Sequence, residues 1–336
     1  MEFLIQQTLT YTIPLLIVAL AGVFAERSGI VNLALEGIMI FGAFVGVLFI
    51  KIMQDTGTFE KEQAQSLMLL TMSVCAVAGA LFSLLLSYAT INLRANQTIG
   101  GTALNMLAPG FVLFATNVLV NQNVLTMSEG DAASWFMLKR SSFGFSKTEE
   151  LNFFENTFLV KNYLTTYICI GLFIVFSVII YKTRFGLRLR ACGENPQAAD
   201  SVGINVSKMR YAGTTLSGAL AGIGGFVFAL TTANCSSTGD VAGFGFLALA
   251  VMIFGNWNPL TIAAASFVFG LFKCIAAAYS TLDINGDGVY ALAEIGISTN
   301  FYRMLPYIIT LVVLAFTSKS SRAPKAAGVP YDKSKR

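Results

Sequence analysis

The chain has 336 residues, of which 55% are hydrophobic and 12% are charged, and its mean hydropathy is +0.68. Soluble globular domains carry about twice this share of charged residues, so the composition excludes a water-soluble enzyme. The formal net charge of +4, from 22 basic and 18 acidic residues, is too small to indicate a nucleic-acid partner.

Apolar windows along the chain indicate membrane-spanning helices. Such a helix needs about 20 mostly apolar residues, because lipid offers its backbone no hydrogen-bond partners. The windows that satisfy this are Leu4–Ala25, Ile30–Ile50, Leu67–Ala89, Ile99–Val120, Tyr163–Tyr181, Tyr211–Thr231 and Leu260–Tyr279. Two shorter windows, Gly243–Gly255 and Met304–Phe316, indicate helices that extend into polar flanks or are broken at membrane depth. We predict an all-α polytopic membrane protein with about nine transmembrane helices, within a range of eight to ten.

The charged residues predict the orientation of these helices. If all nine windows cross, one set of loops and the tail hold 14 basic and 4 acidic residues, and the opposite set holds 7 basic and 13 acidic residues. The positive-inside rule makes the first set cytoplasmic. We therefore expect a transmembrane domain over residues 1–317 with an external N-terminus. A cytoplasmic loop covers residues 182–210, and a basic, mobile cytoplasmic tail over residues 318–336 anchors to lipid headgroups.

The cytoplasmic loop contains a predicted short helix. Asn195 can cap free backbone amides, Pro196 suits the first helical position, and Gly203 suits the helix end. A short amphipathic helix among basic residues fits either a docking element or a solvated connector, and the pattern alone does not choose between them.

This loop resembles the EAA-x3-G loop by which permease subunits of ABC importers engage their ATPases. Gln197, Ala198, Ala199 and Gly203 match that motif, with Gln in place of Glu. The run Gly186–Asn205 resembles the branch of this superfamily that moves simple sugars, nucleosides and branched-chain amino acids. The segments similar to the second permease of nucleoside importers are Ala25–Gly37, Thr98–Phe111, Gly243–Leu260 and Leu305–Phe316.

This resemblance implies a permease subunit of an ATP-driven nucleoside importer in a bacterial cell membrane, with the ABC importer permease fold. The implied partners are ABC ATPase subunits, a second, homologous permease and an extracytoplasmic solute-binding lipoprotein. The chain has no G-x-x-x-x-G-K-[ST] motif, so ATP and Mg²⁺ are expected on the partner ATPase and no cofactor on this chain. Alternatives are the same machinery carrying ribose, another simple sugar or branched-chain amino acids, and an ion-coupled secondary transporter or channel. An enzyme is not expected, because no histidine and no convincing catalytic constellation is present.

Polar residues inside the predicted spans are candidates for the substrate pathway. Asn32 and Glu36 are four residues apart in the second window, which would place them on one helix face, and Asn105 is in the middle of the fourth. Such groups are costly in lipid and tend to face a pathway, where they could bind ribose hydroxyls or a base. The alternative is a polar clamp between packed helices.

Two aromatic residues and one lysine complete the predicted pathway. Phe244 and Phe246 begin the short window that starts at Gly243, and their rings could stack on a nucleoside base. Lys273 could extend its ammonium toward the interface, pair with Glu36 or line the pore, and the sequence leaves these three roles open.

An acidic segment in an outer loop matches a calcium-binding pattern. Asp283, Asn285, Asp287 and Glu294 have the oxygen-ligand spacing of an EF-hand loop, and Gly288 occupies the turn position. The sequence therefore offers a candidate calcium site, while an acidic loop that keeps the outer face soluble is the alternative.

Overall fold

The computed structural model describes residues 2–127, 135–138, 152–158, 160, 162–279, 298–317 and 322–332. The longer helices are α1 (Glu2–Arg27), α2 (Leu35–Asp55), α3 (Ala64–Ser87), α4 (Gln97–Val120), α7 (Leu164–Lys182), α10 (Val206–Thr231), α12 (Pro259–Ala278) and α14 (Thr299–Thr317). The shorter elements are η1 (Lys61–Gln63), η2 (Tyr88–Asn92), β1 (Leu125–Thr126), α6 (Phe153–Phe158), α8 (Arg184–Glu194), α9 (Pro196–Ser201), β2 (Ser236–Ser237) and α11 (Phe244–Phe254).

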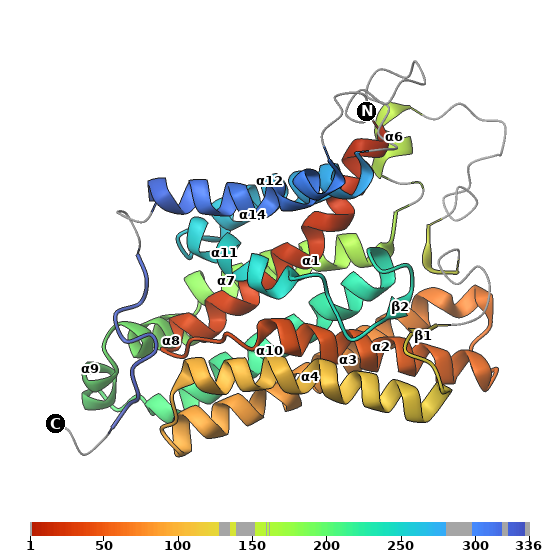
Figure 1. Ribbon diagram of the computed structural model, residues 1–336. Coiled ribbons are helices and arrows are strands. Elements are labelled where there is room, and N and C mark those ends of the chain that lie inside the picture. The colour runs from red at the N-terminus through yellow and green to blue at the C-terminus, as the bar shows by residue number, and fades with distance from the viewer. Residues whose placement is uncertain are drawn as a thin grey trace.

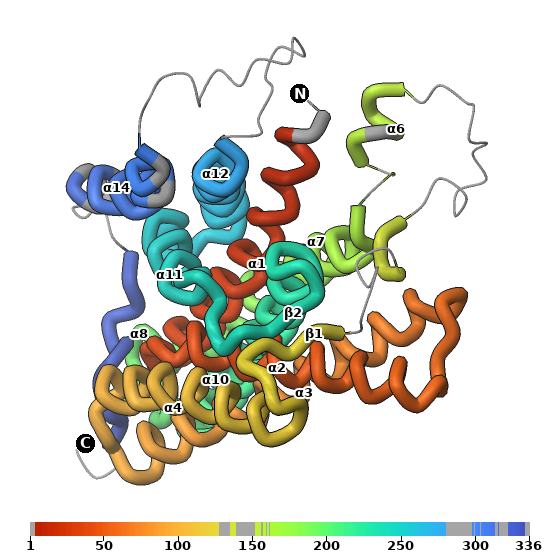
Figure 2. Tube along the Cα trace, turned by 45° about the vertical axis from the view of Figure 1, so that its right-hand side comes forward, coloured from red at the N-terminus to blue at the C-terminus, as the bar shows by residue number. Residues whose placement is uncertain are grey.

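The bundle has two distinct ends. Helices α8 and α9 lie at one end together with the C-terminus, and the N-terminus and α6 lie at the other (Figure 1). Strands β1 and β2 pair antiparallel, with Leu125 opposite Ser237. In both views α12 and α14 lie side by side next to α11 (Figure 2).

The predicted spans are confirmed as helices. Seven helical segments in the described residues are long and apolar enough to cross a membrane, and each contains most of one expected window. The two shorter windows also form helices. Helix α11 has 11 residues and is too short to cross a membrane alone, whereas α14 has 19 residues. The sequence therefore predicted both the helical class and the position of the short helix.

Helix α10 forms the centre of the bundle, with α1, α2 and α3 packed against it. In the apolar windows of α1 and α10, 83% of the residues are buried, against 22% in α4. Small residues allow this packing: a Cβ atom at Gly222 would lie 2.3 Å from the carbonyl oxygen of Cys75 on α3. The glycine-rich part of α10 therefore allows close helix packing.

The start of α2 differs from the prediction. The second window begins at Ile30, but α2 begins at Leu35, and Asn32 lies in the connection that precedes it. Gly29 has a left-handed φ of +95°, and the Asn32 side chain accepts a hydrogen bond from Ala34 N at 3.1 Å. Because these local interactions end the helical path, Asn32 and Glu36 do not share a helix face as predicted.

Before α11 the chain is non-helical and turns sharply. Residues 238–241 contain no helix, and Ala242 and Gly243 have left-handed φ values of 51° and 72°. The helix that follows starts inside the bundle, where Phe244 is 1% exposed. Of the two arrangements that the short window left open, a helix broken near Gly243 therefore agrees with the structure.

The C-terminal tail also differs from the prediction of a mobile segment. Residues 322–332 lie against the helical body, where Ala326 N donates to the Gly193 carbonyl oxygen at 2.8 Å. The Asp332 carboxylate accepts two hydrogen bonds from Arg94. Basic composition alone did not reveal these contacts, because their partners are far away in the sequence.

Candidate functional site

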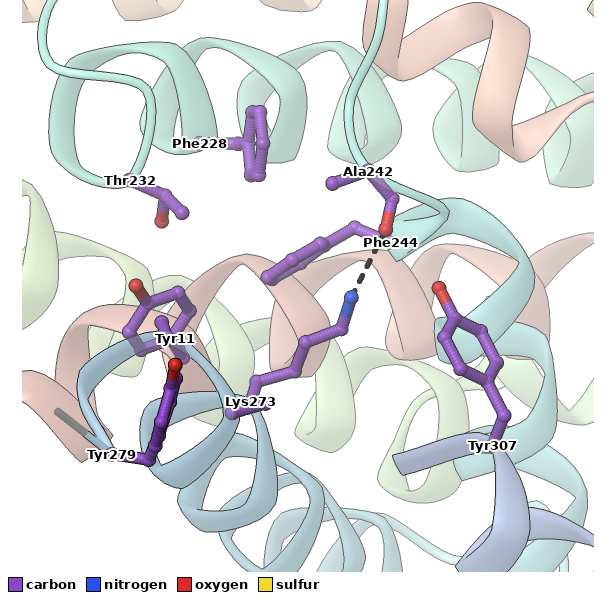
Figure 3. Close-up of a pocket in the computed structure, with 10 residues that line it drawn as sticks. Tyr11, Phe228, Thr232, Ala242, Phe244, Lys273, Tyr279 and Tyr307 are labelled. Carbon is purple, nitrogen blue, oxygen red and sulfur yellow. Dashed lines mark hydrogen bonds between the residues drawn. The ribbon is translucent and has the colours of Figure 1, made fainter. Parts of the chain in front are cut away.

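A cavity of about 690 Å³ lies between α1, α10, α11, α12 and α14. Aromatic side chains from all five helices or their ends line it, and Lys273, Thr232 and Ala242 add polar groups (Figure 3). The aromatic residues are Tyr11, Phe228, Phe244, Tyr279 and Tyr307. This volume is within the range of about 300–1,000 Å³ that is common for small-molecule sites.

Lys273 places a cation at the wall of this cavity. Its Nζ donates a hydrogen bond to the Ala242 carbonyl oxygen at 3.0 Å, and it lies 4.9 Å from the centre of the Phe244 ring and 5.4 Å from that of Tyr307 (Figure 3). Both distances are within the range of cation–π contacts. Within the described part of the chain, Lys273 forms no ion pair with Glu36 at 4.0 Å or less. Lys273 therefore lines a cavity, and a role in a pore stays a prediction.

The aromatic side chains form a cluster around Phe244. The Phe228 and Phe244 ring centres are 4.9 Å apart, and those of Tyr11 and Phe244 are 6.4 Å apart. Flat rings together with phenol hydroxyls and an ammonium can bind a ligand that has both a flat aromatic part and hydroxyl groups.

A second, more polar cavity of about 400 Å³ adjoins the first. Tyr11 and Thr232 line both cavities, and Gln6, Asn162 and Asn234 add amide groups to the second. Because Gln6 belongs to the first turns of α1, this cavity lies toward the end of the bundle that carries the N-terminus (Figure 1).

Glu36 holds the start of α11. Its carboxylate accepts hydrogen bonds from the backbone amides of Gly243 at 2.9 Å, Gly245 at 2.6 Å and Phe246 at 3.2 Å. These amides are free because they belong to the first turn of a helix, whose dipole also favours a negative charge there. Glu36 is thus an N-terminal cap for the broken helix, and it is not among the residues that line the aromatic cavity.

Asn32 and Asn105 also bind backbone groups around the same break. Asn105 donates to the Leu33 carbonyl oxygen at 2.7 Å and accepts from Gly37 N at 2.8 Å. Asn32 donates to Ser217 Oγ on α10 at 3.0 Å. Neither side chain lines the aromatic cavity. These contacts favour the polar-clamp interpretation, and a direct contact with substrate stays a prediction for both residues.

The two candidate phenylalanines lie differently. Phe244 lines the aromatic cavity, whereas Phe246 is not among its lining residues and is 51% exposed. The sequence did not single out Tyr11, Tyr279 or Tyr307, which belong to segments that are far apart in the chain. An aromatic residue in an apolar helix resembles any lipid-facing one, so no local signal distinguishes these three.

The short helix predicted within residues 182–210 is confirmed as α9. Asn195 Oδ1 accepts from Ala198 N at 3.0 Å, Pro196 is the first helical residue, and Gly203 follows the helix with φ +82°. Ala199 is buried, while Gln197 and Ala198 are exposed. The helix therefore presents an exposed face at the end of the bundle.

The candidate calcium ligands Asp283, Asn285, Asp287 and Glu294 lie outside the described residues. In the residues that the structure does describe, no group of three or more His, Cys, Asp or Glu could hold a metal ion.

Apolar helices around an aromatic cavity, with a broken helix beside it, have the architecture of a multi-pass membrane permease. The chain belongs to the family described as "Branched-chain amino acid transport system / permease component", which matches residues 4–314. It is a transport component rather than an enzyme.

Relatives resemble the chain over its full length. It is 38% identical to the nucleoside ABC transporter permease protein NupC of Lactococcus lactis, over 100% of this chain and 98% of the relative. It is also 38% identical to the guanosine ABC transporter permease protein NupQ of Bacillus subtilis, with the same coverage. A second Lactococcus lactis nucleoside permease, NupB, is 24% identical over 96% of this chain and 85% of the relative. No solved structure matches the chain.

Proposed function

We propose that the chain is the permease subunit of an ATP-driven importer for nucleosides. The observation that carries this proposal is the aromatic cavity with the ammonium group of Lys273 at its wall. The similarity to NupC and NupQ supports the same substrate class. It also favours an ATP-driven machine over an ion-coupled carrier, because both relatives are ABC transporter permeases.

A nucleoside combines a flat base with a ribose that carries several hydroxyl groups. The base can lie against the rings of Phe228 and Phe244, where offset and edge contacts between rings contribute about 0.5–1.5 kcal/mol each. Lys273 Nζ can donate to a ribose or base oxygen, and the hydroxyls of Thr232 and Tyr11 can donate or accept. Solute would enter through the polar cavity around Asn162 and move on into the aromatic one.

The importer requires further subunits. ATP and Mg²⁺ would bind to ABC ATPase subunits, since this chain lacks a phosphate-binding loop. NupB and NupC are two permeases from one organism, which supports a second, homologous permease beside this chain. An extracytoplasmic binding lipoprotein would deliver the solute. The chain would lie in a bacterial cell membrane, with its N-terminus outside and α8, α9 and the tail in the cytoplasm.

Helix α9 is the proposed contact for the ATPase. Asn195, Gln197, Ala198, Ala199 and Gly203 would form the coupling element, in which the exposed face of α9 binds the ATPase. Closure of the ATPases on ATP would move α9 and shift the bundle between outward-open and inward-open states.

Uptake by the assembled transporter tests this function. The chain would be co-expressed with its partner permease, ATPase and binding protein, and the complex reconstituted into liposomes that contain ATP. We expect uptake of labelled guanosine that inosine competes for and that ribose and leucine leave unchanged. If only ribose or only leucine competed, the substrate would be a simple sugar or a branched-chain amino acid instead. Uptake without ATP would contradict an ATP-driven importer.

We also propose that the candidate calcium site binds calcium, which a separate experiment tests. Calcium titration of the purified chain should give a binding signal that disappears in the double variant Asp283→Ala and Glu294→Ala. Identical titrations of both proteins would eliminate the site.

A further inference from the structure

The C-terminal tail packs beside α9. The tail segment, residues 322–332, contacts the end of α8 through the hydrogen bond from Ala326 N to the Gly193 carbonyl oxygen, at 2.8 Å. Gly193 is two residues before the Asn195 cap of α9. The tail segment is therefore fixed directly at the base of the proposed coupling helix.

A small apolar cluster holds α9, and the tail segment covers it. Cys192, Ala199 and Val206 form a buried cluster that is separate from the main core of the bundle, and Tyr331 of the tail segment packs against it. Ala199 is the buried residue of α9. The attachment of α9 to the protein thus includes an aromatic side chain from the far end of the sequence.

The tail segment also reaches two elements of the transmembrane bundle. Arg210 on α10 is 1% exposed, donates to the Val329 carbonyl oxygen at 3.0 Å and lies 5.9 Å from the centre of the Tyr331 ring. Arg94, which follows η2 between α3 and α4, binds Asp332 through two hydrogen bonds of 2.9 and 3.2 Å. The tail segment therefore connects α8 and α9 with the ends of α10, α3 and α4.

A groove runs between α9 and the tail segment. It has a volume of about 390 Å³, with Asn195 and Gln197 on one wall and Lys325 and Val329 on the other. These four residues are exposed, and α9 lies at the end of the bundle that carries the C-terminus (Figure 1).

We propose that α9 and residues 322–332 form one composite docking surface for the ATPase, and that the tail segment transmits the movement of α9 to α10 and η2. This inference rests on the proposed function, because it assigns the ATPase as the occupant. It extends the expected docking helix to a second segment, whose contacts span the distance between α9 and the bundle.

The composition of the surface defines the partner. Leu187, Val202 and Val329 expose 61%, 74% and 54% of their surface at this end. Lys208 and Lys325 are exposed at the same end, as is Glu194, which forms an ion pair with Arg27. Exposed apolar groups with cations beside them fit an apolar groove with an acidic rim on the ATPase, since the opposite charges steer the approach.

A truncation tests the proposal in the assembled complex. A chain that ends at residue 321 would be compared with one that ends at residue 332, which keeps the tail segment and loses only Lys333, Lys335, Arg336 and Ser334. We expect the amount of ATPase that co-purifies with the shorter chain to fall several-fold, or its uptake per ATP hydrolysed to be mostly lost. The control should match the full chain in both measurements. Equal ATPase retention and equal uptake in the two truncated chains would overturn the proposal.

A charge exchange tests the transmission without removing the segment. Arg94→Asp alone should lower uptake several-fold, and adding Asp332→Arg should restore it, because the exchanged pair can re-form. A double variant that is no better than Arg94→Asp would contradict a role for this ion pair.

Two further measurements separate the possible failures. If the full chain itself retains no ATPase, the proposed function fails and not only this inference. The second case is that both truncated chains retain the same amount of ATPase, and that the shorter chain loses uptake only in vesicles with anionic lipid. The tail segment would then bind lipid headgroups, and the docking proposal would be overturned.

Discussion

At the scale of single residues, the broken helix depends on one carboxylate. Glu36 is almost fully buried, and its oxygens bind three backbone amides at the start of α11. A buried carboxylate in a membrane protein suggests a substrate contact, but here the free amides of a helix start already account for it. The sequence could reveal Glu36 as unusual, but its partners were not predictable because they are about 200 residues away.

Replacing this carboxylate should weaken the protein. Glu36→Gln keeps the shape of the side chain, but one of the two accepting oxygens becomes an NH₂ group that faces backbone amides. We expect a loss of about 1–3 kcal/mol of stability, the range for leaving a buried hydrogen-bonding group without a partner. The check is the melting temperature in detergent, with Asp55→Asn as a control because Asp55 is on the same helix and largely exposed. Equal melting temperatures for the two variants would contradict the capping role.

Lys273 is the residue whose charge faces the aromatic cavity. Lys273→Met keeps the length of the side chain and removes the ammonium that binds the Ala242 carbonyl oxygen and faces Phe244 and Tyr307. We expect uptake at low nucleoside concentration to fall about tenfold or more, since a hydrogen bond to a charged group contributes about 1.5–3 kcal/mol. Lys51→Met, near the end of α2 and not among the residues that line the cavity, is the control. A variant with unchanged uptake would show that the cation does not contact the solute.

At the scale of elements, hydropathy predicted the helices and local chemistry predicted α9. Each long helix has an apolar window, and Asn195, Pro196 and Gly203 mark the ends of α9 through interactions of neighbouring residues. The predicted start of α2 was wrong. The residues from Ile30 onward are apolar enough for a helix, and hydropathy does not report the turn at Gly29 and Asn32.

Close helix packing should make α10 sensitive to a single methyl group. Gly222→Ala places a Cβ atom 2.3 Å from the Cys75 carbonyl oxygen, so α3 and α10 must separate. Overpacking of this kind costs about 1–3 kcal/mol. Gly171→Ala on α7 is the matched control, because its Cβ atom would meet nothing within 4 Å. Melting in detergent should drop for the first variant alone, and an equal drop for both would argue against a tight contact.

At the scale of the whole molecule, the cavity and the tail contacts could not be predicted. The cavity combines Tyr11 from the first helix with Tyr307 from the last one described, and only the packing of the bundle brings them together. The same is true of Arg94 and Asp332, which are 238 residues apart. In contrast, Phe244 was found because it begins a short apolar window, and such an interrupted span is visible in the sequence.

The orientation of the whole protein gives the last prediction. All five cysteines are buried, so a cysteine introduced at an exposed position would be labelled against a low background. Burial also raises the pKa of the Cys192 thiol, at the end that carries α9, to about 11. This thiol therefore stays protonated and unreactive at neutral pH.

Two conservative substitutions probe the two ends of the bundle. Ser201→Cys lies on exposed α9, and Thr58→Cys lies in the exposed connection after α2. In intact cells, a membrane-impermeant maleimide should label Thr58→Cys only, and opening the membrane should make Ser201→Cys reactive as well. Labelling of Ser201→Cys from outside would place α9 on the external face. The positive-inside assignment would then be wrong, and an ATPase in the cytoplasm could not contact α9 or the tail.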